Sequence, residues 1–373
     1  MSLQEYEGCN FLRQRLILST LSGVPVKITN IRSKGESPGL LEYEVELLQL
    51  LEKMTNGSKT NISVTGTALV YRPGILLGGH VEHACNLQRG IGYTLEFLLP
   101  LVPFCKKTTT IILTGITNGL SDPSVDLLKG TSLPLLKKFG VSDEVNLEVK
   151  KRGMPPEGGG KVALHCPNVK KLRFSRFTEQ GKIKRIRGVA FSCRVSPQIS
   201  NQLVTAARSV LNKFIPDIYI YTDHRKADQS GKSPGYGLVL FAETTEGVIL
   251  SAEANSLPRG TDYNNMTAED VGILAANYLL DEIYKGGCTD SVNQSLAAIM
   301  MTLCEPNVVK FTTGPFTPYT VQCLRHIRDF YTTVFKLETI SSNEGKAGNF
   351  TGSSKVLMTC VGVGYSNYSK TSL

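Results

Sequence analysis

The feature that most constrains this chain is a unit that recurs three times along it. In each copy, the periodicity of the apolar residues predicts a helix, a strand, a second helix and two more strands. The predicted elements lie at residues 11–21, 26–31, 40–51, 62–65 and 68–71, then at 93–103, 110–114, 125–139, 145–149 and 161–164, and finally at 295–303, 308–312, 318–331, 333–338 and 356–361. The sequence therefore predicts an α/β (α+β) fold in which three βαββ-type units form a large domain.

The spacing of the copies predicts an inserted domain. The lead strands of the first two copies start about 84 residues apart, whereas those of the second and third are separated by nearly 200. The intervening segment has its own pattern of strand, helix, strand, strand pair and helix. We therefore expect residues 1–183 and 286–373 to form the large domain and residues 184–285 to form a smaller α/β domain.

Positive charge is concentrated in one part of the sequence. The chain has a formal net charge of +9, and residues 137–187 contain fourteen basic and five acidic residues, so this window accounts for the whole excess. Such an excess favours polyanionic partners. The rest of the composition is that of an ordinary globular protein, which excludes long disorder and a coiled coil.

Two motifs in the basic window are candidate anion sites. Gly158-Gly-Gly160 lies between Arg152 and Lys161, so it could bring backbone N–H groups close to an RNA phosphate, or it could simply turn the chain between two strands. Lys182-Ile-Lys-Arg-Ile-Arg187 has alternating basic residues that could contact phosphate or keep a solvated strand edge from aggregating.

Other motifs predict no site. Gly231-Lys-Ser233 is not a Walker A loop, because position 226 is Lys rather than Gly. His80, His83 and Cys85 lack a second cluster to complete a zinc site, so we expect a loop with solvated imidazoles and no metal. The nine cysteines contain no CxxC pair, which predicts reduced thiols in an intracellular protein. No apolar segment reaches the length of a membrane span, and no secretory signal is expected.

Motifs along nearly the whole chain resemble the RNA 3'-terminal phosphate cyclase family, and most closely its eukaryotic nucleolar branch. The shared stretches include Leu21-Ser-Gly-Val-Pro25, Tyr71-Arg-Pro-Gly74, Asp122-Pro-Ser-Val-Asp126, Arg152-Gly-Met-Pro-Pro156, Asp217-Ile-Tyr-Ile-Tyr-Thr-Asp223, Ser230-Gly-Lys-Ser-Pro-Gly235 and Val361-Gly-Val-Gly-Tyr-Ser-Asn367. The resemblance implies a fold of three repeats with an inserted small domain, in agreement with the spacing of the units.

The resemblance also identifies where the chain departs from the active family members. Cyclases adenylylate a histidine shortly after a Phe-Thr-Thr strand. This chain keeps Phe311-Thr-Thr313 but has Tyr319 in the place of the nucleophile. A phenol is a poor nucleophile at neutral pH, and His326 lies two helical turns further on, too far to substitute. The Gly-rich opening of cyclases is also replaced, by Glu7-Gly-Cys-Asn-Phe-Leu-Arg13.

We therefore expect a non-cyclase member of the family with no cofactor. The resemblance implies a nuclear, nucleolar role in processing pre-rRNA for 18S rRNA and the small ribosomal subunit. It further implies work with the U3 small nucleolar ribonucleoprotein and a large nucleolar GTPase. The candidate anion or RNA contacts are Arg13, Arg15, Arg32, Arg152, Lys161, Lys184, Arg185 and Arg187. Two alternatives remain open at this stage: a pre-rRNA endoribonuclease, and an ATP-dependent cyclase that uses Tyr319.

Overall fold

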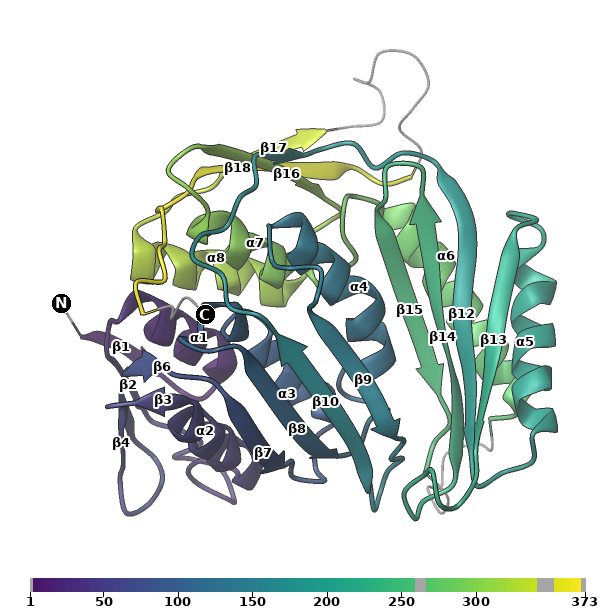
Figure 1. Cartoon of the computed structure of the whole chain (residues 1–373), viewed down its shortest axis with the longest axis horizontal. Coiled ribbons are helices and arrows are strands. Elements are labelled where there is room, and N and C mark those ends of the chain that lie inside the picture. Colours follow the sequence, from purple (N-terminus) through teal and green to yellow (C-terminus); the bar gives the residue numbers. More distant parts are fainter. Residues whose placement is uncertain (1–2, 259–265, 341–351, 370–373) are drawn as a thin grey trace.

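The repeated unit is a four-stranded sheet with its own helices, and it occurs three times (Figure 1). The computed structural model describes residues 3–258, 266–340 and 352–369. The sheets have the strand orders β1-β2-β5-β4, β7-β8-β10-β9 and β11-β16-β18-β17. In each of them the first two strands are parallel and the other neighbours are antiparallel. The predicted α/β class with three repeated units is confirmed.

The elements of the three units follow one another in the same order. The first unit contains β1 Gln4–Glu7, α1 Leu12–Ser22, β2 Val26–Thr29, α2 Glu42–Met54, β4 Lys59–Ile62 and β5 Leu69–Arg72, with a short pair β3 Thr55–Asn56 and β6 Ile75–Leu76. The second contains β7 His80–Ala84, α3 Ile91–Leu98, a 3-10 turn Val102–Phe104, β8 Thr109–Gly115, α4 Val125–Lys138, β9 Asn146–Lys151 and β10 Gly160–Cys166. The third contains β11 Arg176–Phe177, α7 Gln294–Leu303, β16 Val308–Thr313, α8 Pro318–Tyr331, β17 Lys336–Ile340 and β18 Lys355–Val361.

Each unit begins with a strand that the sequence pattern did not predict. These strands are β1, β7 and β11, and each pairs in parallel with the next strand of its unit. The expectation of a loop around His80 and His83 is therefore wrong, because both residues lie on β7. Its alternation places His80 in solvent and buries His83. Two buried positions among polar residues give too weak a signal for a period-two pattern.

Local sequence explains why the longer elements form where they do. The strand β8 alternates between buried and half-buried residues along its whole length, as expected for a strand with one face on a core. The helix α4 begins at a cap, because the Ser124 hydroxyl accepts a hydrogen bond from the backbone N–H of Leu127 at 3.1 Å. Thr317 caps α8 in the same way, and Pro318 occupies its first turn, where no N–H is needed.

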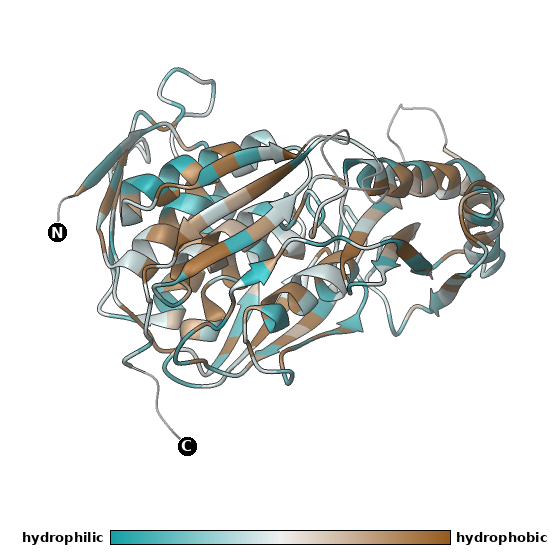
Figure 2. Cartoon of the chain, turned by 90° about the horizontal axis from the view of Figure 1, so that it is seen from above, coloured by the Kyte–Doolittle hydropathy of each residue, from teal (hydrophilic) through white to brown (hydrophobic). Residues whose placement is uncertain are grey.

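Five helices of the three units lie together in the interior. Contacts link α1 to α3 and α8, α7 to α4 and α8, and α3 to α4. Figure 2 shows apolar residues concentrated in these enclosed helices and in the strands beside them. The three units therefore share one hydrophobic core, and residues distant in the sequence meet at its centre.

The inserted segment forms a fourth sheet with two helices. Its elements are β12 Ile183–Cys193, α5 Gln198–Leu211, β13 Ile218–Arg225, β14 Gly235–Thr244, β15 Ile249–Asn255 and α6 Ala268–Lys285. The strand order is β13-β12-β14-β15, with β13 at one edge (Figure 1). Contacts also join β14 and β15 to α4 of the second unit. Gly130 of α4 permits this approach, since a Cβ there would lie 2.3 Å from the Phe241 ring.

The insertion interrupts the third unit rather than preceding it. The strand β11 ends at Phe177, the inserted sheet starts with β12 at Ile183, and the unit resumes with α7 at Gln294. Because β11 has only two residues, the repeat pattern gave no sign that the third unit had already begun. The inserted sheet is therefore connected at both ends to the same unit.

Candidate functional site

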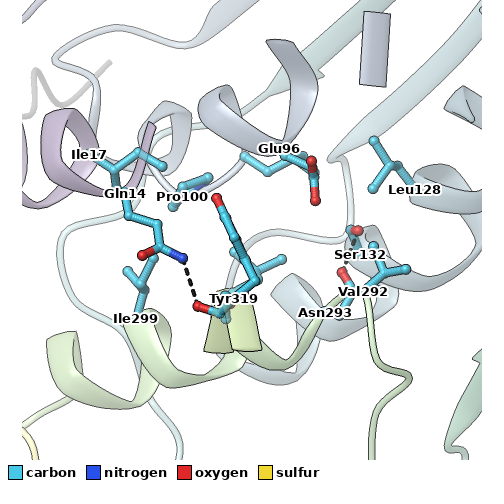
Figure 3. A pocket seen from close by; sticks show the side chains of 13 residues that line it. Gln14, Ile17, Glu96, Pro100, Leu128, Ser132, Val292, Asn293, Ile299 and Tyr319 are labelled. Atoms are coloured by element: carbon cyan, nitrogen blue, oxygen red, sulfur yellow. Dashed lines mark hydrogen bonds between the residues drawn. The ribbon is translucent and has the colours of Figure 1, made fainter. Parts of the chain in front are cut away.

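Tyr319 lies in the first turn of α8, immediately after the turn that follows β16. Its backbone carbonyl accepts a hydrogen bond of 2.9 Å from the Gln14 side chain on α1. Its ring points into a cavity between α1, α3, α4 and α7 (Figure 3). The place of the cyclase nucleophile is therefore held rigidly, and its side chain faces the interior of the helix layer.

The cavity around Tyr319 is small. Its volume is about 30 Å³, room for one or two water molecules. Gln14 and Ile17 line it from α1, Glu96 from α3, and Leu128 and Ser132 from α4 (Figure 3). Sites that hold a nucleotide-sized ligand are roughly ten times larger. The cavity beside the Tyr319 ring is therefore too small to hold a nucleotide.

Arg13 is neutralised beside Tyr319. One of its Nη1 hydrogens is donated to Glu96 Oε2 at 2.5 Å and another to the Tyr93 carbonyl at 3.0 Å. The guanidinium also packs over the Tyr93 ring, with 4.2 Å between Cζ and the ring centroid. The cation predicted to contact an anion is therefore already paired with a carboxylate of α3.

The Tyr319 hydroxyl is a weak acid in this setting. Burial raises the pKa of Tyr319 to about 12, and the favourable charge of Arg13 only partly opposes that effect. A phenol with this pKa stays protonated at neutral pH. It is therefore a poorer nucleophile than a free tyrosine.

His326 does not replace the missing imidazole. It is fully buried, and the lining of the Tyr319 cavity does not include it. Its Nε2 faces two donors, Gln322 Nε2 at 3.1 Å and Arg15 Nε at 3.5 Å, so Nε2 accepts and Nδ1 donates to Gln14 Oε1 at 3.0 Å. Burial and the nearby Arg15 charge lower the pKa of His326 to about 3. Both ring nitrogens are thus used inside the fold, and Arg15 is held with them.

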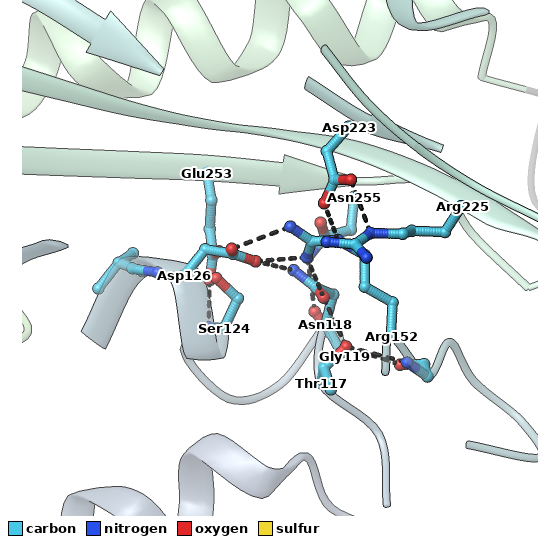
Figure 4. A network of polar contacts seen from close by, with 12 residues as sticks. Thr117, Asn118, Gly119, Ser124, Asp126, Arg152, Asp223, Arg225, Glu253 and Asn255 are labelled. Carbon is cyan, nitrogen blue, oxygen red and sulfur yellow. Dashed lines mark hydrogen bonds and ion pairs between the residues drawn. The ribbon is translucent and has the colours of Figure 1, made fainter. Parts of the chain in front are cut away.

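Arg152 is the centre of a buried network (Figure 4). Its Nη1 and Nη2 atoms bind both oxygens of Asp126 at 2.6 and 3.0 Å, and its Nε binds Asp223 at 2.8 Å. Arg225 completes the network by donating to the other oxygen of Asp223 at 2.7 Å. The Arg152 side chain is only 3% exposed. It therefore ties α4 and the β9–β10 connection to the inserted sheet, and presents no charge to a ligand.

A buried carboxyl lies close to this network. Glu253 of β15 accepts a hydrogen bond of 2.8 Å from the backbone N–H of Ser124, the cap of α4 (Figure 4). Its second oxygen is buried and has no hydrogen-bond partner among the described residues. Burial raises the pKa of Glu253 to about 7. This contact is a second polar link between α4 and the inserted sheet.

The other predicted contacts differ in how available they are. Arg32 forms a two-pronged pair with Glu44, at 2.7 and 2.8 Å, within the first unit. Arg185 pairs with Glu243 and Arg187 with Asp217 at the surface of the inserted sheet. Lys161 and Lys184 are exposed and form no ion pair with any residue of the described chain. The structure brings Lys184, Arg185 and Arg187 together on β12 and leaves Lys161 apart on β10.

The two glycine-rich loops pack against each other. A Cβ at Gly231 would lie 1.7 Å from the Gly158 carbonyl, so this close approach requires glycine. Ser233 of the second loop accepts a hydrogen bond from the Glu157 N–H at 3.1 Å, which explains its presence without a bound phosphate. A cleft of about 520 Å³ opens beside them, lined by Lys151, Arg194 and Lys232 among others.

These three cations were not on the predicted list. Lys232 stood inside the Gly231-Lys-Ser233 motif and Lys151 inside the basic window, and Lys151 of β9 pairs in register with the predicted Lys161 of β10. The position of the Arg194 side chain could not be predicted, because the backbone carbonyls that hold its guanidinium, those of Ala227 and Gly231, come from a distant loop.

Other classes of site find no support in the described part of the chain. It contains no cluster of three or more His, Cys, Asp or Glu side chains that could hold a metal ion. All nine cysteines are free thiols, and seven of them are buried. No described helix has both the length and the apolar character that crossing a membrane requires.

Comparison with known proteins places these observations in a family context. The sequence profile described as RNA 3'-terminal phosphate cyclase matches residues 4–337. An "RNA 3'-terminal phosphate cyclase-like protein" of Homo sapiens is 56% identical over 98% of this chain and 97% of its own length. A "Probable RNA 3'-terminal phosphate cyclase-like protein" of Drosophila melanogaster is 49% identical over 98% and 96%. The "rRNA processing protein rcl1" of Schizosaccharomyces pombe is 41% identical over 99% and 98%.

Proposed function

The chain belongs to the RNA 3'-terminal phosphate cyclase family, and from this premise we propose that it is a non-cyclase member that binds RNA during ribosomal RNA processing. The proposal that the protein is not a cyclase rests on the residue and the space at the position of the nucleophile. Tyr319 replaces the histidine, its pKa is raised to about 12, and the cavity around it has a volume of about 30 Å³. The replaced nucleophile and the small volume of the cavity both argue against cyclase activity.

The second half of the proposal rests on charge and on relatives. A relative that spans nearly the whole chain is named an rRNA processing protein. The candidate RNA contacts with accessible charge are Lys161, Lys184, Arg185 and Arg187. The surface pairs of the two arginines are weak enough to exchange for phosphate contacts. Arg13, Arg15, Arg32 and Arg152 instead support the fold through the internal contacts described above.

The more specific part of the proposal concerns where in the cell the protein acts and with which partners. We propose that the protein acts in the nucleolus on the precursor of 18S rRNA, for the small ribosomal subunit. We further propose that it works with the U3 small nucleolar ribonucleoprotein and a large nucleolar GTPase. The support for these specifics is the family resemblance of the sequence motifs.

A complementation experiment tests the proposal directly. Depletion of the protein from cells should cause unprocessed small-subunit rRNA precursors to accumulate, as measured by RNA blotting. The variant Tyr319→Phe should restore processing fully, because the proposed function needs the ring and not the hydroxyl. Normal processing after depletion would reject the rRNA role. Failure of Tyr319→Phe, with the protein present at the normal level, would reject the non-enzymatic role and favour chemistry at the phenol.

A further inference from the structure

The inserted sheet has one face covered by helices and one face that is only half covered. Ser200 of α5 donates a hydrogen bond of 2.8 Å to Ser192, so even-numbered residues of β12 face α5. The odd-numbered residues must then face the other side. On that side α4 packs on β14 and β15, at the far end of the strand order from β13. The uncovered part of the face is therefore formed by the first halves of β12 and the edge strand β13, because Arg152 packs over Phe191 and binds Asp223 toward the other end.

Two tyrosines stand on this uncovered part. Tyr219 and Tyr221 of β13 pair in register with Arg187 and Val189 of β12, so they share the odd-numbered face. Their side chains are 55% and 57% exposed, and their ring centroids lie 4.5 Å apart at an angle of 79°. Neither hydroxyl has a hydrogen-bond partner within the described chain. The two rings thus form one aromatic surface that remains largely exposed among the described residues.

Positive side chains border the aromatic surface. Arg187 is the register neighbour of Tyr219, and Lys184 and Arg185 precede it at the start of β12. Arg187 is bound to Asp217 at 2.8 Å, an exposed pair whose partner can be exchanged at low cost. Lys184 is exposed and forms no ion pair with the described residues, and it lies at a bulge where the register between β12 and β14 shifts, so the odd-even alternation does not assign it to the opposite face. The aromatic surface on β13 therefore lies beside a run of basic side chains at the start of β12.

We propose that Tyr219 and Tyr221 stack against unpaired bases of RNA while Lys184 and Arg187 contact its phosphates. This inference rests on the proposed RNA-binding function and specifies both the surface and the form of RNA. Stacking on a protein ring requires a base free of its own partner, so the surface favours single strands over duplexes. Exposed aromatic rings flanked by Lys and Arg are the combination that single-stranded RNA requires.

A structural explanation for the tyrosines is the alternative. Tyrosine has a high preference for strands, and neighbouring rings stabilise a sheet. That explanation predicts that removing the rings lowers stability without a selective effect on RNA. Binding of a protein strand to the free edge of β13 is a different use of the same region, and it would not depend on unpaired bases.

The test is RNA binding by the full chain, measured by fluorescence anisotropy with a labelled single-stranded RNA of about ten nucleotides and a duplex of the same length. The double variant Tyr219→Ala, Tyr221→Ala should bind the single strand about tenfold to a hundredfold more weakly. Tyr219→Phe, Tyr221→Phe should bind as the wild type, because it keeps both rings. Tyr278→Ala removes a ring that is 46% exposed on α6, on the covered side of the sheet, and should have no effect.

Each outcome decides between the possibilities. If wild-type protein binds the single strand and the double alanine variant, folded by its melting temperature, binds equally well, the tyrosine surface is wrong and the proposed function stands. If duplex RNA binds as tightly as the single strand, stacking on the rings is also rejected. If the wild type binds neither RNA, the proposed RNA-binding function itself fails.

Discussion

The guanidinium carbon of Arg13 lies 5.7 Å from the centre of the Tyr319 ring. A cation this close to the nucleophile position would suit a phosphate, but Glu96 already binds Arg13. Arg13, Glu96 and Tyr319 come from three helices, α1, α3 and α8, that meet in the shared core. The charge that remains at this position is therefore balanced within the protein.

The first prediction concerns adenylylation. Purified protein incubated with radiolabelled ATP and an RNA that ends in a 3'-phosphate should acquire no covalent label, and it should form no cyclic end. The reason is the protonated phenol of Tyr319 in a cavity too small for a nucleotide. Electrophoresis of the denatured protein and analysis of the RNA end measure both products.

The matched control for adenylylation is Tyr319→Phe, which should give the same background as the wild type. An AMP adduct on Tyr319 identified by mass spectrometry, and chased off by the phosphorylated RNA, would contradict the prediction and restore the cyclase interpretation.

The second prediction concerns the buried network of Figure 4. Arg152→Met keeps much of the side-chain volume but leaves the carboxylate of Asp126 without its cation and Asp223 with Arg225 alone. Removing one partner of a buried pair costs about 3–5 kcal/mol, so the free energy of unfolding should fall by that amount. Urea denaturation followed by circular dichroism measures it.

Arg187→Met is the comparison for this loss of stability. It breaks the exposed pair with Asp217, which should contribute no more than about 1 kcal/mol. Equal losses for the two variants would show that Arg152 does not have the structural role assigned to it.

The third prediction concerns the basic segment of β12. Charge reversal by Lys184→Glu and Arg185→Glu should weaken RNA binding and flatten its salt dependence, since each lost phosphate contact lowers the slope by about 0.7 on a double-logarithmic plot. Titrations at several salt concentrations give the slope. Lys59→Glu, a reversal on β4 of the first unit, should change neither value as strongly. A slope unchanged by the double reversal would exclude this segment from the RNA contact.

The fourth prediction concerns pH and His326. Its folded pKa of about 3 lies below the ordinary value of 6.5, so the unfolded chain binds more protons between those limits. The contribution of this histidine is therefore complete above pH 6.5 and is lost as the pH falls. Between pH 7 and pH 5 the wild type should lose about 2 kcal/mol relative to His326→Gln, at 1.36 kcal/mol for each pH unit below 6.5. Urea denaturation at both pH values measures the difference, and a constant difference would mean that folding does not lower the pKa of His326.

The sequence predicted those parts of the fold that depend on local periodicity. Strands such as β8 and helices such as α4 carry an alternating or helical apolar pattern over many residues. The strands β1, β7 and β11 were missed because they are short, and β1 and β7 are rich in polar side chains. Only pairing with the next strand of the unit, which is a tertiary contact, identifies them.

The candidate site could likewise be predicted only where it depends on local sequence. The position of Tyr319 could be found by counting from Phe311, because the distance lies within one strand, turn and helix. The partners that decide its chemistry could not, since Gln14 and Glu96 reach it from helices distant in the sequence. Basic residues were recognised by type, but whether each is free or paired depends on carboxylates such as Asp223 that no local pattern connects to them.

The insertion between β11 and α7 has a consequence for synthesis on the ribosome. The first two sheets are complete once residue 166 has emerged, so each can form as the chain is made. The third cannot, because β11 must wait for β16, which is translated about 130 residues later. During that interval the newly made inserted sheet is tethered to an unfinished neighbour, and the third sheet is completed only when β17 and β18 have followed β16.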